Sequence, residues 1–566
     1  MRPPLPLLLV ALALPAQADV YDPPWAGIRS ATVLVHAYDA AKSPLENGDL
    51  LRSAIAALQP GSRLEIEAGD YDVGFQALVV NLAGTADDPI WIVAKDAAPP
   101  VLTSSTGGVV FTAGIGGFVT RYVAFRRLEV RDANAAFALG ACSQVWIDQC
   151  HLHHVGAGVA AVTHDADAIH VTRNEMHHVD GGLARGVWLG SEFPSPEASA
   201  VSQSVVALNH IHEGGLHGGG IELAQGSYGN WIVRNHVHDM VYPCLTAFGT
   251  GGQAANRIEE NVFYTGGQFA AKVQGEAVFR NNLLLGGTPD KAAFRSEAVW
   301  DQPRDLAVVH NTFVASGVGA DLRDWGGQPG MVFANNAVYA GPDKAAILYL
   351  GDFRETTFAG NVAAGVVTEG LPGVAPGDGL ALDFEGVSAD ASDKNALPLP
   401  SGALAGAAVA GFGVDTDLTG APHRDPPSAG CYEPGSYGLH YGFGLPGSGQ
   451  LTPRISANSF PALGNAAFAL HLYDAKPFAP AALVVGIAKQ ELPVLGGLGL
   501  TLPNVALGAF VGPGGEGAVG APIPLLPAAG QTVYAQWIVF DPAAPQWFAF
   551  ADGLELTLGE VTLPGP

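Results

Sequence analysis

Short stretches in which apolar and polar residues alternate recur through the middle of the chain, each built around one asparagine. The phrase has the form apolar-x-x-Asn-x-apolar, as in VTRNEM, IVRNHV and VVHNTF, and turn-forming residues follow within a few positions. A period of two is that of a β-strand, so each repeat is a set of short strands. The repeated position is occupied, at intervals of about 20 to 35 residues, by Cys150, Asn174, Asn209, Asn235, Asn261, Asn281, Asn311, Asn336 and Asn361.

A repeat of this length indicates a solenoid, in which one coil cannot bury its inner face alone and stacked coils bury a continuous apolar column. Each coil adds about 4.8 Å along the axis, the strand spacing of a sheet. An asparagine repeated at one turn can bond along the stack and to backbone groups that the turn leaves unpaired. Leucine-rich repeats need a leucine consensus that this sequence lacks, and propeller blades are longer. The sequence therefore predicts an all-β fold, a right-handed parallel β-helix.

A second strand follows each asparagine turn, as in GVWLG, GIELA, AAKVQ and AFRSE. Because side chains alternate between the two faces of a strand, one set points into the helix and its neighbours point out. The predicted inward set is Val187, Leu189, Ile221, Leu223, Ala271, Val273, Phe294 and Leu322. The predicted outward column, a shallow groove whose length suits a chain polymer, is Trp188, Glu222, Thr246, Lys272, Arg295 and Arg323.

Composition supports this fold class and narrows the partners. The 566 residues include 74 Gly and 41 Pro with 48% hydrophobic residues, too apolar for a disordered chain and too rich in turn formers for a helical one. The 27 Lys+Arg and 53 Asp+Glu give a net charge of −26, which repels nucleic acid and anionic membranes. We expect an extracellular polysaccharide as partner, no nucleic acid, no membrane span and a monomeric chain. An acidic polysaccharide would need a local cluster of basic residues.

The two ends of the chain predict export and a second domain. Met1 to Ala18 reads as a signal peptide, with an early Arg2, an apolar run and the small-residue cleavage site Ala16-Gln17-Ala18, so we expect a secreted, extracellular protein. The β-helix domain is predicted over residues 19–440, a Gly/Pro-rich linker over 441–453, and a β-sandwich accessory domain over 454–566. This last domain resembles carboxy-terminal attachment or sorting modules of secreted bacterial proteins.

The chain contains four cysteines, Cys142, Cys150, Cys244 and Cys431, whose spacing specifies no disulfide framework. In an oxidising compartment they can form up to two bridges. Buried free thiols are the alternative.

Three segments resemble a known family. NGDLLRSAIAALQPGSRLEIEAGDYDV, residues 47–73, is similar to the amino-terminal cap of the pectate-lyase-like superfamily. GTADDPIWIVAKDAAPPVLTSS, residues 84–105, resembles the second coil of the chondroitinase B and alginate lyase branch, and DLTGAPHRDPPSAGCYE, residues 417–433, resembles a closing segment of bacterial β-helix proteins. The resemblance covers about residues 28–435 and implies a right-handed parallel β-helix that acts on polysaccharide.

The charged members of the outward column suggest a lyase. A lyase for uronic-acid polysaccharide must neutralise the carboxylate, remove the C5 proton and protonate the leaving oxygen. The family resemblance implies that a Lys and an Arg about one coil apart act as base and acid, and that Ca²⁺ or basic side chains neutralise the carboxylate. Lys272 and Arg295, 23 residues apart, are the candidates. The predicted substrate-binding residues are Trp188, Arg185, Arg323 and His217.

The longest interval in the repeat, between Asn174 and Asn209, contains the insertion SEFPSPEASAVS. Insertions in a solenoid form loops on one face, often the binding face. Trp188 beside such a loop is a candidate platform for sugar stacking. We therefore expect a cleft around coils two to six.

Glu222, in HGGGIELA, supports a second hypothesis, a glycoside hydrolase. Such enzymes use two carboxylates, and Asp239 or Glu213 could be the partner of Glu222. No paired-carboxylate motif stands out, and a salt bridge from Glu222 to Lys272 or Arg185 is the structural alternative. A third hypothesis is a non-catalytic surface or adhesion protein in which the β-helix is a spacer.

Histidines recur on one edge of the predicted coils, at the third position after the repeated residue (His153, His177, His212, His238) and at the first (His151, His210, His236). Imidazoles on adjacent coils can bind a transition metal, and the predicted ligands are His177, His212, His238 and Asp239. His212 or His238 could instead be a proton-abstracting base near neutral pH. Structural stacking of like residues along the turns is the alternative to both.

Overall fold

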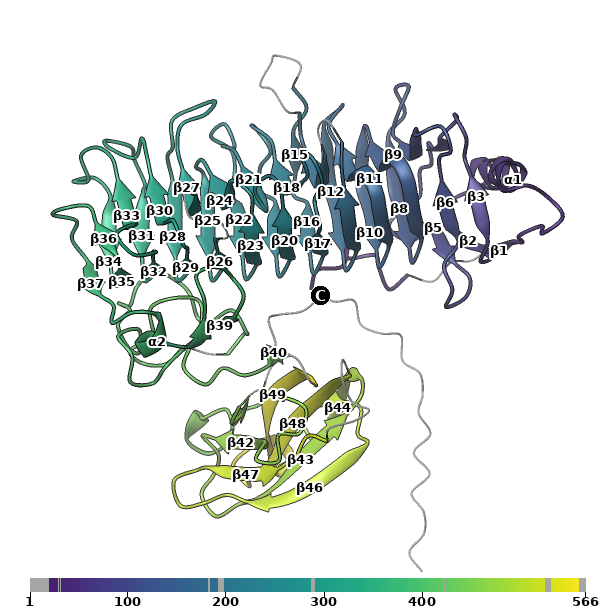
Figure 1. Cartoon of the computed structure of the whole chain (residues 1–566). Coiled ribbons are helices and arrows are strands. Elements are labelled where there is room, and N and C mark those ends of the chain that lie inside the picture. The colour runs from purple at the N-terminus through teal and green to yellow at the C-terminus, as the bar shows by residue number, and fades with distance from the viewer. Residues whose placement is uncertain are drawn as a thin grey trace, which may run out of the picture.

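The computed structural model describes residues 20–28, 30, 32–181, 184–191, 198–286, 291–421, 423–442, 444–459, 461–524 and 531–558. The chain forms a right-handed parallel β-helix followed by a smaller β domain (Figure 1), so the predicted fold class is confirmed. The predicted signal peptide and residues 192–197 of the insertion lie outside the described residues. In the described ranges, no helix is long and apolar enough to cross a bilayer.

The first face of the β-helix is a parallel sheet to which each coil contributes one strand. Its strands, in order, are β1 (Thr32–His36), β2 (Ser62–Ile66), β5 (Ile90–Ala94), β8 (Thr120–Arg126), β10 (Cys142–Asp148), β12 (Ala166–Thr172), β16 (Val205–Ala207), β19 (Trp231–Val233), β22 (Asn256–Glu259), β25 (Ala277–Arg280), β28 (Leu306–Val309), β31 (Val332–Ala334) and β34 (Thr357–Ala359). The short β15 (Val201–Ser202) also pairs with β12.

The second face follows the repeated asparagine in each coil. Its strands are β3 (Asp70–Asp72), β6 (Val101–Thr103), β9 (Glu129–Leu139), β11 (His151–Ala161), β13 (Glu175–Val179), β17 (His210–His212), β20 (His236–Met240), β23 (Val262–Gly266), β26 (Leu283–Leu285), β29 (Thr312–Val314), β32 (Ala337–Tyr339), β35 (Asn361–Ala364) and β37 (Val374–Pro376).

The third face completes each coil. Its strands are β4 (Leu78–Val80), β7 (Val109–Ala113), β14 (Arg185–Leu189), β18 (Gly219–Leu223), β21 (Leu245–Ala247), β24 (Phe269–Val273), β27 (Ala292–Ser296), β30 (Val318–Leu322), β33 (Ala345–Tyr349) and β36 (Val366–Val367). The long strands β9 and β11 turn the corner between the second and third faces, so they pair with strands of both.

The interior of the β-helix is one apolar core that runs along the axis. All eight residues of the predicted inward set are buried in it. Like side chains stack on successive coils, as in Phe111 and Phe137, whose ring centroids are 5.0 Å apart and nearly parallel. The alternation of strand side chains therefore also fixes which residues of the third face point outward.

The asparagine ladder is continuous from Asn361 back to Cys150, with one correction to the sequence prediction. In each step between two asparagines, a side-chain oxygen accepts from the backbone N–H and the side-chain amide of the preceding coil; Asn209 accepts both from Asn174 at 3.0 Å. Cys150 donates only its backbone N–H, to Asn174. The partner of Asn261 is Asn282 rather than Asn281. In VFRNNLL each asparagine has an apolar residue three positions before it and another two positions after it, so both fit the repeat. The ladder residue is the one that follows the positive-φ position, and Asn281 itself has φ 52°.

The ends of the β-helix are covered by different elements. At the amino-terminal end lies α1 (Pro44–Ala56), which begins with a capping box between Ser43 and Glu46. Beyond the last coil, α2 (Leu380–Asp383), β38 (Phe384–Val387) and β39 (Lys394–Pro398) belong to a covering segment, residues 380–437, that packs outside the second face from β23 onward. Outward positions of that face are accordingly apolar there, as at Leu285 and Val314.

The carboxy-terminal domain is built from antiparallel strands around a separate core that contains Trp537. One sheet has the order β40 (Leu439–Tyr441), β49 (Phe548–Thr557), β48 (Thr532–Phe540), β43 (Pro480–Gly486), β46 (Val505–Phe510); another has β41 (Arg454–Ala457), β42 (Ala469–Tyr473), β47 (Gly517–Gly520). β44 (Lys489–Val494) pairs with β45 (Gly497–Thr501), and two 3-10 turns span Ser448–Gln450 and Pro545–Trp547. Both larger sheets contribute to the core, as in a sandwich.

The four cysteines are free and buried, so of the two alternatives the structure has thiols rather than bridges. Cys150 lies at the start of the asparagine ladder, where its backbone N–H donates to Asn174. Cys142, Cys244 and Cys431 lie in apolar surroundings of the β-helix and its covering segment.

Candidate functional site

The outward column of the third face is formed as predicted over five coils. Trp188, Glu222, Thr246, Lys272 and Arg295 are partners in register on β14, β18, β21, β24 and β27. The next position is Asp321 and not Arg323, because Arg295 pairs with Asp321 on β30. Arg323 follows the end of this strand, and its Nε donates to Asp321 at 2.9 Å. Asp321 and Arg323 lie on either side of the inward Leu322, so alternation alone did not choose between them.

Lys272 and Arg295 converge on one carboxylate. Lys272 Nζ lies 2.8 Å from Oε1 of Glu297, and Nη1 of Arg295 lies 3.6 Å from Oε2 of the same residue. Nη2 of Arg295 also contacts Asp321 at 2.8 Å, and its guanidinium carbon lies 4.2 Å from the ring centroid of Phe269. The side chains of Lys272, Arg295 and Glu297 remain about one-fifth exposed, so solvent reaches this cluster. Sequence reasoning missed Glu297, two residues after Arg295.

Glu222 is held in a salt bridge, the structural alternative considered for it. Its Oε2 accepts from Nε of Arg185 at 2.6 Å, and the residue is 4% exposed. Its neighbours in register are Trp188 and Thr246, so the adjacent coils offer no second carboxylate at this position. A glycoside hydrolase needs two carboxylates that face the substrate. The surroundings of Glu222 give no support to that chemistry.

The other predicted sugar contacts surround this salt bridge. Trp188 is 8% exposed and lies under the guanidinium of Arg185, 5.8 Å from the ring centroid. Arg185 also donates to the backbone carbonyl of His217, whose ring packs at 5.8 Å against Tyr242. The ring of Trp188 is therefore largely covered by protein, which leaves little surface for sugar stacking.

The family resemblance implies Ca²⁺ as a possible cofactor, but the residues of the column do not fit this ion. Ca²⁺ needs six to eight oxygen ligands, several of them carboxylates. The three carboxylates here each contact a cation already: Glu222 contacts Arg185, Glu297 contacts Lys272, and Asp321 contacts Arg295. We derive no step through calcium.

The histidine edge, residues 151–154, 175–178, 210–213 and 236–239, lies on the second face next to the corner with the third. His153, His177, His212 and His238 form one column in register, with ring centroids 5.0 to 5.3 Å apart and nearly parallel planes. His151, Glu175, His210 and His236 form the neighbouring column. Tyr264 closes the first column by stacking on His238 at 4.5 Å, where the covering segment begins.

The two columns are linked by short contacts between imidazoles. Nε2 of His151 lies 2.8 Å from Nε2 of His177, and Nε2 of His210 lies 2.9 Å from Nε2 of His238. Because His177, His212 and His238 are stacked with parallel planes, their nitrogens do not converge on one point. Nitrogens converge where His177 meets its chain neighbour His178, and where both columns contribute, as at His210, His236 and His238. Asp239, the fourth predicted ligand, instead contacts Nδ1 of His238 at 2.7 Å.

Burial favours the neutral form of four imidazoles of this edge, those of His177, His210, His236 and His238. It lowers the pKa of His177 and of His210 to about 4, with a further contribution from neighbouring histidines. The pKa of His236 is lowered well below 6.5 for the same reasons, and that of His238 is lowered by burial against the opposing effect of Asp239. Neutral imidazoles have a free lone pair, which a metal ion or a proton can use.

A cleft of about 500 Å³ lies beside the histidine edge, and none of the residues that line it belongs to the outward column. Polar side chains of His154, His178, Asp180 and Glu213 line it, with Gly156 and Gly215 among the small residues of its wall. Nδ1 of His178 lies 3.3 Å from a carboxylate oxygen of Glu213. The cleft thus combines imidazoles and carboxylates on successive coils.

No protein-family model matches the chain, and no curated protein matches it in sequence. Among solved structures it is similar to pectate lyase Pel9A, with TM-score 0.39 and 15% identity over 72% of this chain and 98% of that one. It is also similar to the alginate lyase from Paenibacillus sp. str. FPU-7, with TM-score 0.38 and 17% identity over 58% and 99% of the two chains. The PL6 family alginate lyase AlyGC gives TM-score 0.31 and 12% identity over 74% and 60%.

These likenesses are of low identity and low TM-score. At such TM-scores they carry no information about the reaction. Function has to be argued from the chain's own residues.

Proposed function

We propose that this protein is a lyase for a uronic-acid polysaccharide, with Lys272 and Arg295 at the reacting centre. The observation that supports this most directly is their register: they are partners on adjacent strands and share one carboxylate, that of Glu297. Two cations spaced to hold a protein carboxylate can hold a uronate carboxylate in the same way. The column and its ion-pair partners contain four cationic side chains, Arg185, Lys272, Arg295 and Arg323, and three carboxylates, Glu222, Glu297 and Asp321. The cations thus outnumber their carboxylate partners here, although the whole chain has a net charge of −26.

In the proposed reaction, Lys272 and Arg295 bind the uronate carboxylate as cations. Lys272 then gives one proton to solvent and, as the free amine, takes the C5 proton while Arg295 stabilises the charge that develops on the carboxylate. The C4–O bond then breaks, a C4–C5 double bond forms, and the departing oxygen takes a proton from a solvent water beside Arg295. In the free protein Glu297 occupies Lys272 through an ion pair, which the substrate carboxylate has to displace.

The substrate belongs outside the cell. Export through the signal peptide Met1–Ala18 would bring the protein to an extracellular polysaccharide, and amino-terminal sequencing of protein recovered from the medium should begin at Asp19. We propose that the chain acts there as a monomer, since each residue invoked comes from one chain.

The test is incubation with alginate, pectate and chondroitin, with the ultraviolet absorbance of unsaturated uronate as readout. We expect absorbance to grow with at least one of them, and to fall by about a hundredfold or more in Lys272→Ala and Arg295→Ala. Arg304→Ala is the matched control, since Arg304 also pairs with a carboxylate, Glu276, but lies off the column. If new reducing ends form without unsaturated uronate, the protein is a hydrolase and the proposal is wrong. Failure to cleave any of the uronate polymers would also contradict the proposal.

A further inference from the structure

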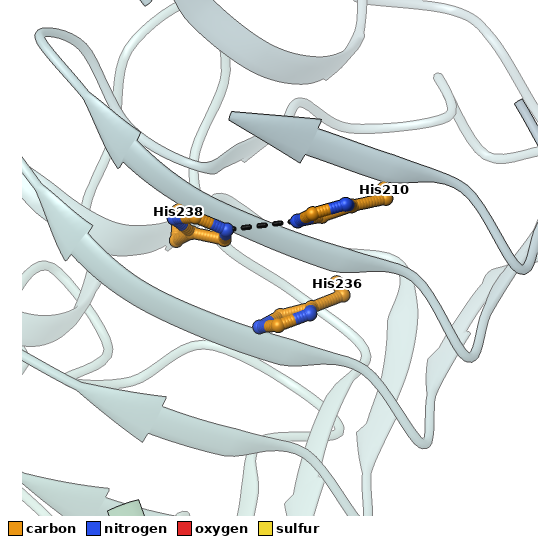
Figure 2. Close-up of side chains that lie close together, drawn as sticks. All are labelled: His210, His236 and His238. Atoms are coloured by element: carbon orange, nitrogen blue, oxygen red, sulfur yellow. Dashed lines mark hydrogen bonds between the residues drawn. The ribbon is translucent and has the colours of Figure 1, made fainter. Parts of the chain in front are cut away.

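We propose that His210, His236 and His238 bind one divalent transition-metal ion of the kind that prefers imidazole nitrogen, such as Zn²⁺. The three rings come from β17 and β20, adjacent strands of the second face, and lie around a common space (Figure 2). This site is separate from Lys272 and Arg295, and does not depend on the proposed lyase activity.

The nitrogens of these histidines are spaced as metal ligands. One nitrogen from each ring lies within 4.8 Å of the other two, and Nε2 of His210 and Nε2 of His238 are 2.9 Å apart. In a tetrahedral zinc site with Zn–N distances of about 2.0 to 2.1 Å, ligand nitrogens are about 3.3 Å apart. His210 and His236 are stacked, with ring centroids 5.1 Å apart and an interplanar angle of 15°, so one of these two rings has to turn about its Cβ–Cγ bond for all three nitrogens to meet one ion.

His236 provides an independent indication. Its Nε2 is buried, and among the described residues it has no hydrogen-bond partner. An unsatisfied buried polar atom costs about 1 to 3 kcal/mol, so such atoms are rare unless something binds them. A metal ion at this position would take up the lone pair of His236 together with those of His210 and His238.

The surroundings fix one ligand in the required tautomer. Nδ1 of His238 lies 2.7 Å from Oδ2 of Asp239, so this nitrogen carries the proton and Nε2 presents its lone pair. Oδ1 of the same carboxylate accepts from the hydroxyl of Thr265, which holds it in place. Tyr264 stacks on His238 with an interplanar angle of 4° and prevents the ring from turning away. A carboxylate behind a histidine is the usual support of a metal-bound imidazole.

The choice of this triad over its neighbours follows from ligand chemistry. The other convergent groups on the edge each include a carboxylate from Glu129, Glu175 or Glu213, and the side chain of Glu175 is 52% exposed. His210, His236 and His238 offer nitrogen alone. Asp239 and Lys394 act in opposite directions on His238, and the carboxylate of Glu175 acts on His210. Three imidazoles favour Zn²⁺, Co²⁺, Ni²⁺ or Cu²⁺ over Ca²⁺ and Mg²⁺, and leave a fourth position for water.

The experiment is a Co²⁺ titration of the purified full-length protein after treatment with a chelator. We expect one Co²⁺ per chain with the visible absorption of a tetrahedral complex, displaced by Zn²⁺ and unaffected by excess Ca²⁺. His236→Asn and His210→Ala should each weaken binding by about tenfold or more. His151→Ala is the matched control. His151 lies in the same column as His210 and His236, two coils before His210, and takes no part in this triad.

Two results would overturn the proposal. One is the absence of a Co²⁺ band in the native protein. The other is a band that persists in both His236→Asn and His210→Ala, or that disappears in His151→Ala, since either places the ion elsewhere on the edge. Circular dichroism checks that each variant is folded. If His236→Asn does not fold, the Co²⁺ binding of His210→Ala, at a partly exposed position, tests the proposal.

Discussion

Lys272 and Arg295 face each other across adjacent coils, and both contact the carboxylate of Glu297, which occupies the place proposed for a substrate carboxylate. Removing that charge should favour anionic ligands. We predict that Glu297→Gln binds uronate oligosaccharides a few-fold more tightly than the native protein and with a steeper dependence on salt. Calorimetric titration at two salt concentrations measures both. Weaker binding would mean that Glu297 positions the two cations instead of competing with substrate.

The asparagine ladder predicts unequal effects for two neighbouring asparagines. Asn282→Ala leaves the backbone N–H and the side-chain amide of Asn261 without their acceptor inside the core, and should lower the free energy of unfolding by about 2 to 5 kcal/mol. Asn281→Gly suits the positive φ of that position and loses one bond to the Thr416 carbonyl, about 1 kcal/mol. Urea unfolding of the two variants compares them, and equal losses would contradict the ladder register.

Stability should fall on mild acidification. Burial and the nearby His423 lower the pKa of His310 to about 3, whereas in the unfolded chain it titrates near 6.5. Below pH 6.5 the unfolded state takes up a proton that the native state does not, so the free energy of unfolding decreases toward pH 3. His177 and His210 also lower the free energy of unfolding on acidification, between pH 6.5 and about pH 4.

The measurement is the melting temperature at about pH 7.5 and about pH 5 in the presence of a chelator. We predict a lower melting temperature at the acidic pH, and a smaller difference in His310→Gln. A melting temperature that rises on acidification would contradict the neutral state of these imidazoles.

The four cysteines should be unreactive in the native protein. Burial raises the pKa of Cys142, Cys150 and Cys431 to about 12, so their thiolates are scarce at neutral pH. We predict that intact mass analysis finds no alkylation of native protein and four alkylated thiols after denaturation without reductant. Fewer than four would reveal a disulfide.

The sequence predicted those features that depend on strand alternation and repeat period. The inward residues such as Val187 and Phe294 are buried, and Lys272 and Arg295 stand in register, because both follow from a period of two within a coil. The period alone could not choose between Asn281 and Asn282, since each has an apolar residue three positions before it and two positions after it. That choice depends on backbone conformation, which only the structure shows.

The site was predicted less completely, because contacts between coils depend on loop length as well as on period. Arg323 seemed to continue the column, but the loop before β30 places Asp321 opposite Arg295. The metal prediction grouped His177 with His212 because they share a repeat position. Shared position produces parallel stacking, whereas convergence needs two positions, as with His236 and His238.

The central proposal is that Lys272 and Arg295 bind the uronate of a polysaccharide. The most direct test is a crystal structure of the protein with a uronate oligosaccharide bound. We predict a sugar carboxylate within hydrogen-bonding distance of both Lys272 and Arg295, with Glu297 displaced from Lys272. An oligosaccharide bound elsewhere, with the contact between Lys272 and Glu297 intact, would contradict it.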